Sequence, residues 1–322
     1  MESIDAFLLV SFGGPEGIDD VMPFLRNVVK GRNVPDERLK EVAKQYELFG
    51  GVSPINQQNR LLIEKLQQEF KQSGVRLPIY WGNRNWQPML ADTVRQMKAD
   101  GITRALAFVT SAFSSYSGCR QYLEDIERAR TEVGDGAPEI LKVRAFWNHP
   151  GFIEPVAENV RAALNKFGNG ETGTVPVVFT AHSIPKAMAD NCAYEEQLKE
   201  ACAMVMQRVG DNPWSLAFQS RSGPPTQPWL EPDIGDQLQQ LSATGTKKVV
   251  VMPIGFVSDH MEVLFDLDTK AQQTARELGM HMQRAATVGV HPQFISMIRE
   301  LVQEGTPPAC RPDCCNYTPH GR

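Results

Sequence analysis

The sequence lacks any long apolar run. Its 322 residues contain no stretch that approaches the about 20 apolar residues a membrane helix needs. The opening residues, MESIDAFLLV, combine a short apolar run with an acidic flank and no basic segment. This pattern is typical of a core strand and not of a secretion signal. We therefore expect no integral membrane segment and a cytoplasmic location.

An excess of basic residues is also missing. The chain has 33 Lys and Arg residues against 38 Asp and Glu residues, a formal net charge of −5. Proteins that bind nucleic acid usually carry a basic face, so nucleic acid is not an expected partner. No G-x-G-x-x-G motif follows a predicted strand, which argues against a nicotinamide-dependent oxidoreductase.

Cysteine is scarce and unevenly placed. Three of the six cysteines lie in the body of the chain, and Cys310, Cys314 and Cys315 crowd near its end. A disulfide framework is not expected in a large cytoplasmic protein. The three tail thiols could contribute to a [2Fe–2S] cluster, which needs four cysteines. A zinc site and a free tail remain open as alternatives.

Short apolar runs alternate with longer amphipathic stretches along the chain. Strands are predicted at residues 6–12, 78–81, 105–111, 140–146, 175–181, 215–219, 248–253 and 284–288. Helical patterns between them include residues 59–72, 90–99 and 233–241. Several strands are apolar almost throughout, as in parallel sheets covered on both faces. The alternation predicts a parallel α/β fold.

The two halves of the chain look alike. Residues 89–113 and 230–257 both run from a helix with an acidic start through a Gly into an apolar strand and a polar turn. We expect a duplication into two similar halves, each with a four-stranded parallel sheet flanked by helices. The Gly-rich segment KFGNGETGT predicts domains at 1–168 and 169–304. Residues 305–322 form a cysteine-containing tail, expected as an appendage of the second half.

Polar residues follow two of the predicted strands. Ligands of open α/β sheets bind at the carboxyl ends of strands, so these positions are candidates for a site. His182 ends the run FTAH, and the later segment PIGFVSDHMEVLFDLD carries His260, Glu262, Asp266 and Asp268. Glu262 and Asp266 are four residues apart and share one helix face.

His182 and Glu262 offer chemistry suited to a metal ion. An imidazole and a carboxylate can hold Fe²⁺, and both groups can accept protons. Asp266 and Asp268 could extend the pair into a relay for protons or ions.

Five segments together resemble the ferrochelatase family. They occur in the family's order and read LLVSFGGPEGIDDVMPFLRNV, YELFGGVSPIN, FTAHSIP, QSRSGPP with WLEPD, and PIGFVSDHMEVLFDLD. The resemblance implies two Rossmann-like, chelatase-type domains that enclose a porphyrin cleft. It implies that His182 is the catalytic histidine, that Glu262 is its partner, that Asp266 belongs to an acidic path and that Ser53 binds a substrate carboxylate.

Two positions depart from family patterns. Phe12 stands where some bacterial relatives have a Tyr that can bind the metal from the opposite face. Lys270 stands where some relatives extend the acidic line with a Glu. Insertion from one face by His182 and Glu262 is therefore the expected mechanism.

The segment expected to lie over the cleft is polar. Within residues 13–35 it carries Glu16, Asp19, Asp20, Arg26, Lys30 and Arg32. Such a lip would insert poorly into a bilayer, and the four propionates of coproporphyrin III favour Arg, Lys, Ser and Tyr donors. The expected substrate-binding set is Arg32, Lys30, Ser53, Tyr46, Tyr122 and Phe12. Coproporphyrin III is the expected substrate, and protoporphyrin IX is the alternative.

Part of the ferrochelatase family carries a [2Fe–2S] cluster with three C-terminal cysteines and one internal cysteine. By this resemblance Cys192 is the expected internal ligand beside Cys310, Cys314 and Cys315, with Cys202 in reserve. Cys119 is expected to be a core or cleft-wall residue. The cluster would be structural or regulatory, because metal insertion involves no net redox change.

The expected partners are the porphyrin, an iron donor and a downstream decarboxylase, and the chain is expected to be a monomer. Three rival functions are a chelatase for another metal, a non-catalytic porphyrin or haem carrier, and an iron–sulfur electron carrier. The long α/β body argues against the last, because small carriers do not need two such domains.

Overall fold

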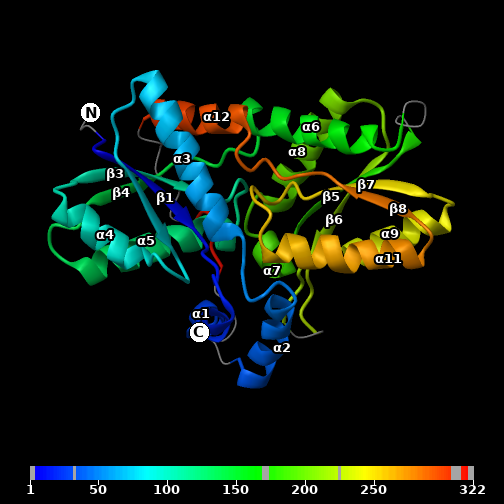
Figure 1. Ribbon diagram of the computed structural model, residues 1–322, viewed down its shortest axis with the longest axis horizontal. Coiled ribbons are helices and arrows are strands. Elements are labelled where there is room, and N and C mark those ends of the chain that lie inside the picture. The colour runs from blue at the N-terminus through cyan, green and yellow to red at the C-terminus, as the bar shows by residue number, and fades with distance from the viewer. Residues whose placement is uncertain (1–3, 32–33, 169–173, 224–225, 306–312, 318–322) are drawn as a thin grey trace. The chain divides into compact units, whose positions relative to one another are not determined.

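The structure, a computed structural model, describes residues 4–31, 34–168, 174–223, 226–305 and 313–317. Within these residues, two sheets of four parallel strands are flanked by helices (Figure 1). This confirms the predicted α/β class with two four-stranded parallel sheets. No helix in the described ranges is long and apolar enough to cross a membrane.

The first sheet has the order β2-β1-β3-β4 and the second the order β6-β5-β7-β8. The strands are β1 (Ala6–Ser11), β2 (Ile79–Asn83), β3 (Arg104–Val109), β4 (Glu139–Lys142), β5 (Val177–His182), β6 (Trp214–Gln219), β7 (Lys248–Met252) and β8 (His281–Arg284). The helices are α1 (Ile18–Val28), α2 (Asp36–Glu47), α3 (Ile55–Ser73), α4 (Leu90–Ala99), α5 (Gln121–Val133), α6 (Pro150–Asn165), α7 (Lys186–Ala189), α8 (Tyr194–Val209), α9 (Ile234–Ala243), α10 (Met261–Val263), α11 (Gln272–Glu277) and α12 (Pro292–Gln303). Two π-helical segments are η1 (Tyr116–Arg120) and η3 (Leu264–Ala271).

The first sheet is covered on both faces. Alternate residues of β1 and β3 pack with apolar residues of α4 and α5 into one core cluster. On the other face the Phe7 ring contacts the Phe70 ring of α3, with centroids 5.6 Å apart. Burial on both faces explains why β1 is a continuous apolar run and not an alternating one.

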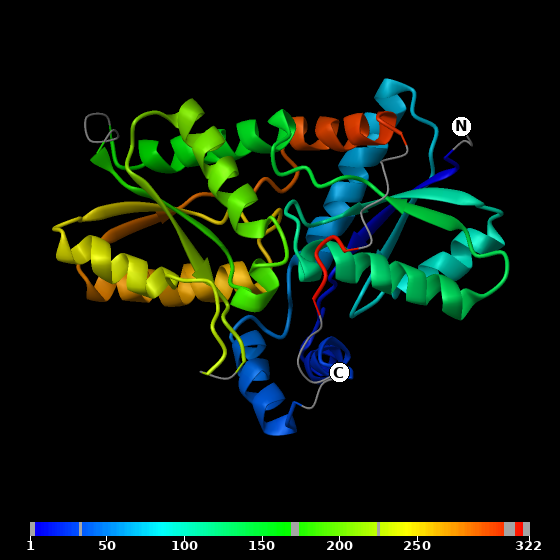
Figure 2. The same cartoon turned by 180° about the vertical axis from the view of Figure 1, so that it is seen from behind.

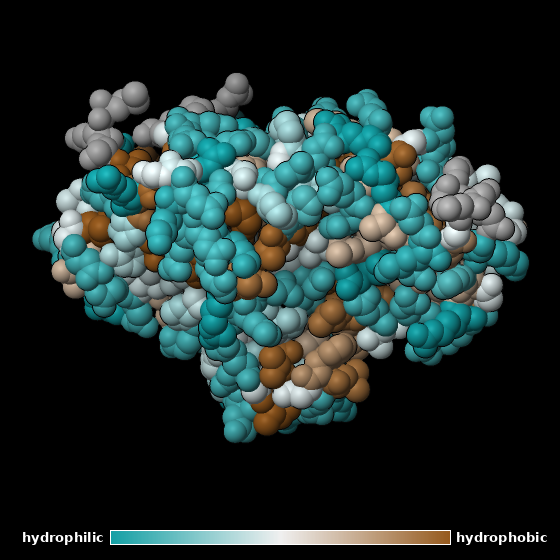
Figure 3. All heavy atoms as spheres, turned by 45° about the horizontal axis from the view of Figure 1, so that its top comes forward, coloured by the Kyte–Doolittle hydropathy of each residue, from teal (hydrophilic) through white to brown (hydrophobic). Residues whose placement is uncertain are grey.

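The helices α1 and α2 pack on each other through a small apolar cluster of their own, which contains Val21, Phe24, Leu25, Leu39 and Ala43. The surface drawn in Figure 3 is mainly hydrophilic, and apolar side chains gather on its lower part. Ile18, Leu48 and Val52 are among the large apolar residues that stay exposed near these two helices.

The second sheet is built in the same way. Residues of β5, β6 and β7 pack with α9, η3 and α11 on one face. Helices α6 and α8 lie side by side over the other face (Figures 1 and 2). β5 is buried up to Ala181, and His182, its last residue, is half-buried at the end of the strand.

The strand order supports the expected duplication. In each sheet the strand that comes first in the chain lies between the second and the third, and the fourth strand pairs with the third. The turn after the second strand is also repeated, because Asn83 N–H donates to Pro88 O at 2.7 Å and Phe218 N–H donates to Pro232 O at 2.8 Å.

The packing divides the chain into two compact units. One contains the described residues of 1–110, 116–144 and 298–322, and the other contains 111–115 and 145–297. Helix α6 belongs to the second unit because it packs along α8 and because Gly151, near its start, lies close to Met297. These limits differ from the domain limits of 1–168, 169–304 and 305–322, which stay a prediction.

The strand expected at residues 284–288 is placed wrongly. The eighth strand is His281–Arg284, paired in parallel with Lys248–Val251. The ladder ends there because β7 runs into Pro253, which has no amide hydrogen to donate.

The described tail residues, 313–317, pack on the first unit and not on the second, where they were expected. Arg120 Nη1 donates to the carbonyl oxygen of Cys314 at 3.4 Å. The Tyr317 ring lies against the Tyr116 ring, with centroids 5.8 Å apart. Figure 2 shows this red segment beside the start of α5, so the described tail residues are packed on the first unit.

Candidate active site

His182 is held with one ring nitrogen available. Its Nδ1 lies 2.5 Å from the carbonyl oxygen of Ser183. A carbonyl only accepts hydrogen bonds, so we assign the proton of the neutral ring to Nδ1. Nε2 then carries a free lone pair. Tyr194 fixes the backbone here, because its hydroxyl donates to His182 O at 3.0 Å.

Glu262 lies next to this free nitrogen. The Oε1 atom of Glu262 is 3.7 Å from His182 Nε2. Two ligands about 2.1 Å from one metal ion are about 3 to 4 Å apart, so the spacing suits a shared ion. The side chains are 35% and 46% exposed, which leaves both within reach of a ligand. The structure thus brings together the two residues that the sequence singled out.

His260 contacts Glu262 through the backbone of Glu262. Its Nδ1 accepts the backbone N–H of Glu262 at 3.2 Å, which caps α10. Burial lowers the pKa of His260 below its ordinary value of 6.5, so the ring is neutral at pH 7. The sequence placed His260 in this segment but gave it no role.

The two aspartates that follow have different surroundings. Asp266 accepts a hydrogen bond from the Ser220 hydroxyl, and Lys270 Nζ lies 3.5 Å from its other oxygen. Asp268 instead accepts from Arg284 Nε at 2.5 Å. Arg284 Nη1 also reaches Asp259 at 2.9 Å. Asp268 is thus engaged by an arginine, and the relay role expected for it stays a prediction.

The expected substrate-binding residues lie in the first unit. Phe12 and Tyr46 both contact the Phe24 ring, at centroid distances of 6.2 and 6.0 Å. Ser53 is buried, and its side chain lies against Gly14, where an added Cβ would sit 2.7 Å from Ser53 Cβ. Lys30 is exposed, and Arg32 lies outside the described residues.

Tyr122 is buried, and burial raises the pKa of its phenol. The guanidinium of Arg84 lies over its ring, 4.4 Å from the centroid, and 5.8 Å from the centroid of Phe12. Asp125 balances this charge, and both side chains of the pair are less than 8% exposed, at 7% and 6%. The sequence analysis missed Arg84, although a charged residue directly after the second strand was a signal.

The expected cluster ligands are divided between the two units. Cys314 and Cys315 lie in the first unit with their sulfur atoms 3.8 Å apart, whereas Cys192 lies in the second. Cys310 lies outside the described residues. In the part of the chain that the structure describes, no three His, Cys, Asp or Glu residues are grouped to hold a metal ion.

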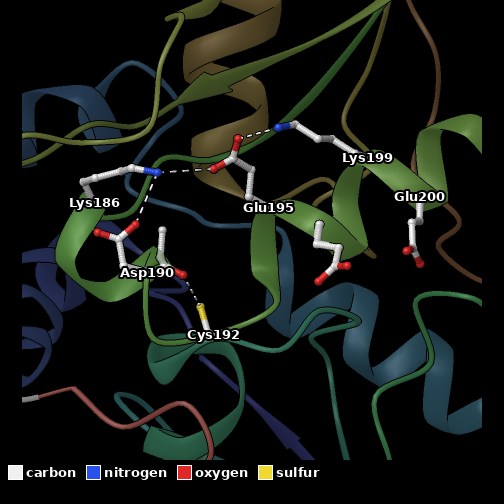
Figure 4. A pocket seen from close by; sticks show the side chains of 8 residues that line it. Lys186, Asp190, Cys192, Glu195, Lys199 and Glu200 are labelled. Carbon is white, nitrogen blue, oxygen red and sulfur yellow. Dashed lines mark hydrogen bonds and ion pairs between the residues drawn. The ribbon is translucent and has the colours of Figure 1, made fainter.

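Cys192 borders a pocket of about 440 Å³ on α7 and α8 (Figure 4). Lys186 bridges Asp190 and Glu195 there, at 3.3 and 3.7 Å, and Lys199 lies 2.7 Å from Glu195. The thiol of Cys192 donates to the Met188 carbonyl at 3.3 Å. The charged groups of this pocket therefore neutralise one another in part.

Comparison with known proteins agrees with this geometry. A sequence model of the ferrochelatase family matches residues 4–306. The ferrochelatase of Rhodopirellula baltica is 58% identical over 98% of this chain and 94% of that protein. The coproporphyrin III ferrochelatase of Streptomyces coelicolor is 50% identical over 93% of this chain and 85% of that protein.

Solved structures support the fold. SirB from Bacillus subtilis with Fe³⁺ superposes with a TM-score of 0.59 at 13% identity, covering 94% of this chain and 98% of that chain. CbiX, the terminal enzyme of sirohaem biosynthesis in denitrifying bacteria, gives 0.54 at 14% identity, covering 94% and 100%. The chain therefore belongs to the ferrochelatase family and is an enzyme that inserts a metal ion into a porphyrin.

Proposed function

We propose that this chain inserts Fe²⁺ into coproporphyrin III, with His182 and Glu262 as its catalytic residues. The observation that carries the proposal is the 3.7 Å pair of His182 Nε2 and Glu262 Oε1 at the end of β5. Insertion replaces two pyrrole N–H protons by one Fe²⁺ ion, and no electron is transferred. The protein must therefore supply proton acceptors beside the site where the ion enters.

The tautomer of His182 suits this task. Its Nδ1–H is occupied by the Ser183 carbonyl, so Nε2 can accept a pyrrole proton or contact the ion. The carboxylate of Glu262 offers a second acceptor and a negative charge that favours Fe²⁺. Asp266, one turn further along the same helical segment, is proposed to receive protons that leave Glu262.

The proposed substrate is supported by relatives and by surface chemistry. Several relatives near 50% identity, from Streptomyces coelicolor and Frankia alni among others, are named coproporphyrin III ferrochelatases. Lys30 is exposed and Tyr46 half-buried, and both offer donors for propionates. Arg32 and the buried Ser53 are proposed to join them. Exposed apolar residues such as Ile18 and Val52 are proposed to contact the macrocycle.

A side-by-side assay tests the substrate. Purified protein, Fe²⁺ and either coproporphyrin III or protoporphyrin IX are mixed without oxygen, and the loss of porphyrin fluorescence is followed. We expect kcat/KM for coproporphyrin III to exceed that for protoporphyrin IX by about tenfold or more, because unpaired donors penalise the substrate with fewer carboxylates. Equal or reversed values would overturn the choice of substrate but not the ferrochelatase reaction.

We also propose that the tail holds a [2Fe–2S] cluster through Cys310, Cys314 and Cys315. Thiolates about 2.3 Å from one tetrahedral metal lie about 3.8 Å apart, and the sulfur atoms of Cys314 and Cys315 are 3.8 Å apart. The sequence analysis named Cys192 as the fourth ligand. Cys119 is better supported, because its neighbour Arg120 contacts Cys314.

The cluster would tie the tail to the first unit and has no part in metal insertion. Protein purified without oxygen should show visible absorption, which Cys314→Ser should abolish. We expect Cys119→Ser to lose the absorption and Cys192→Ser to keep it. The opposite pattern would restore Cys192 as the ligand, and a colourless wild-type protein would refute the cluster.

A further inference from the structure

Gln219 lies beside His182 in the second sheet. It is the last residue of β6, and the parallel register places it directly opposite His182 on β5. Its backbone carbonyl accepts the N–H of Ser183 at 2.8 Å, and its side chain is only 1% exposed. The end of β6 is therefore fixed to the residue that follows His182.

Gln219 and Ser220 both bind the segment that carries Glu262 and Asp266. Gln219 Nε2 donates to the backbone carbonyl of Glu262 at 3.3 Å. The hydroxyl of Ser220 donates to the carboxylate of Asp266. Glu262 and Asp266 are four residues apart, about one helical turn. Gln219 and Ser220 therefore bind two successive turns of one helical segment.

This arrangement depends on an unusual backbone at Ser220. Successive side chains of an extended strand point to opposite faces, so neighbours do not normally reach one helix. Ser220 has φ 61°, in the left-handed region that residues other than glycine rarely adopt. The change of direction lets its hydroxyl follow the Gln219 amide toward the same segment.

Gln219 has a second unfavourable feature, a buried side-chain oxygen without a hydrogen bond to any described residue. Its Oε1 is buried and has no hydrogen-bond partner among the described residues. Buried polar atoms are normally paired, and the exceptions need an explanation. Unfavourable features of this kind persist where function requires them. Two adjacent residues have such features here: Ser220 has a left-handed backbone and Gln219 has a buried oxygen unpaired among the described residues. Both residues also bind the segment that carries Glu262 and Asp266.

We propose that Gln219 and Ser220 are positioning residues that hold Glu262 and Asp266 at fixed places relative to His182. The inference deepens the proposed function and rests on it. The segment needs such anchors because α10 has only three residues and η3 is π-helical, a form usually confined to short turns at functional sites. Lys270 also approaches Asp266, but it belongs to the same segment and cannot tie it to the sheet.

Two substitutions separate positioning from stability. Ser220→Gly removes the hydroxyl and relieves the left-handed backbone, and Gln219→Met removes the amide together with its unpaired oxygen. We expect each variant to melt at or above the wild-type Tm. We expect kcat for iron insertion to fall about tenfold or more with the porphyrin KM within twofold, because small displacements of catalytic groups are costly.

Ser220→Ala completes the comparison. It removes the same hydroxyl but keeps the disfavoured backbone, so it should melt below Ser220→Gly and lose the same kcat. Ser215→Ala, at the other end of β6, is the control and should leave kcat and Tm unchanged.

The inference is overturned if Ser220→Gly and Gln219→Met keep kcat within twofold of wild type, or if kcat falls only in proportion to Tm. His182→Ala in the same assay keeps the two proposals distinct. If His182→Ala is inactive while Ser220→Gly and Gln219→Met are normal, only the positioning role fails. If His182→Ala is itself active, the proposed catalytic pair fails.

Discussion

His182 Nε2 and Glu262 Oε1 lie 3.7 Å apart because two neighbouring strands deliver them to one edge of a sheet. β5 ends at His182, and β7, its partner in the parallel ladder, leads into the turn before α10. We make predictions for the residues around this end of the sheet and for the buried ion pair Arg84–Asp125 of the first unit.

The half-buried His260 should make stability depend on pH. Its folded-state pKa is depressed by burial, so the unfolded chain binds a proton more readily. The stabilisation is complete above the ordinary pKa of 6.5 and is lost as the pH falls from there through the folded value. Denaturant unfolding at pH 7.5 and pH 5.5 should show lower stability at the acid pH.

His260→Asn should flatten this dependence, because Asn keeps an acceptor for the Glu262 N–H but does not titrate. His260→Ala loses the cap as well and should cost about 1 kcal/mol at pH 7.5. An unchanged pH dependence in His260→Asn would contradict the assignment.

Asp266 and Asp268 should respond differently to loss of charge. Asp266→Asn is expected to lower kcat about tenfold or more, as loss of a proton acceptor does. Asp268→Asn should keep kcat within about threefold but lower stability by about 2 kcal/mol, because it weakens a charged hydrogen bond from Arg284. Steady-state kinetics and chemical denaturation of both variants check this, and equal kinetic losses would favour a relay through both aspartates.

The buried pair of Arg84 and Asp125 should respond asymmetrically to substitution. Asp125 also pairs with Arg128, so Arg84→Met leaves it a partner. Asp125→Ala leaves Arg84 buried and charged, because a guanidinium does not lose its proton. We expect Asp125→Ala to cost about 3 to 5 kcal/mol and Arg84→Met to cost less. Urea unfolding of the two variants tests this prediction. A larger loss of unfolding free energy in Arg84→Met than in Asp125→Ala would contradict it.

Gly255 should not tolerate a side chain. A Cβ there would lie 2.6 Å from Ala181 Cβ, just before His182. Gly255→Ala should lower stability by about 1 to 3 kcal/mol and displace the end of β5, with a loss of kcat. Gly17→Ala is the control, because a Cβ there meets nothing within 4 Å. Similar behaviour of the two variants would show that the close approach at Ala181 has no consequence.

The sequence predicted the fold class well because its strands are continuous apolar runs. β7 and the helix Leu90–Ala99 lie where the pattern placed them. The last strand was misplaced because residues 281–284 are mostly polar, with Met282 as the one apolar side chain, and lie at a sheet edge, whereas the strand ends where the apolar run after Arg284 begins. Local hydrophobicity cannot show where a partner strand ends.

The proximity of His182 and Glu262 was predictable because both residues lie at or after the ends of strands and belong to specific family segments. Gln219, Ser220 and Arg284 were not singled out, because their roles depend on contacts between elements far apart in the chain. The place of the tail was also missed, since its contact with Tyr116 and Arg120 leaves no local pattern.

The most direct test of the account is iron insertion by His182→Ala and Glu262→Gln. Each variant is mixed with Fe²⁺ and coproporphyrin III without oxygen, and fluorescence loss is compared with wild type after circular dichroism confirms folding. The account predicts a fall in kcat of about 100-fold or more for each variant. Near-normal rates in both folded variants would show that the reaction does not depend on this pair.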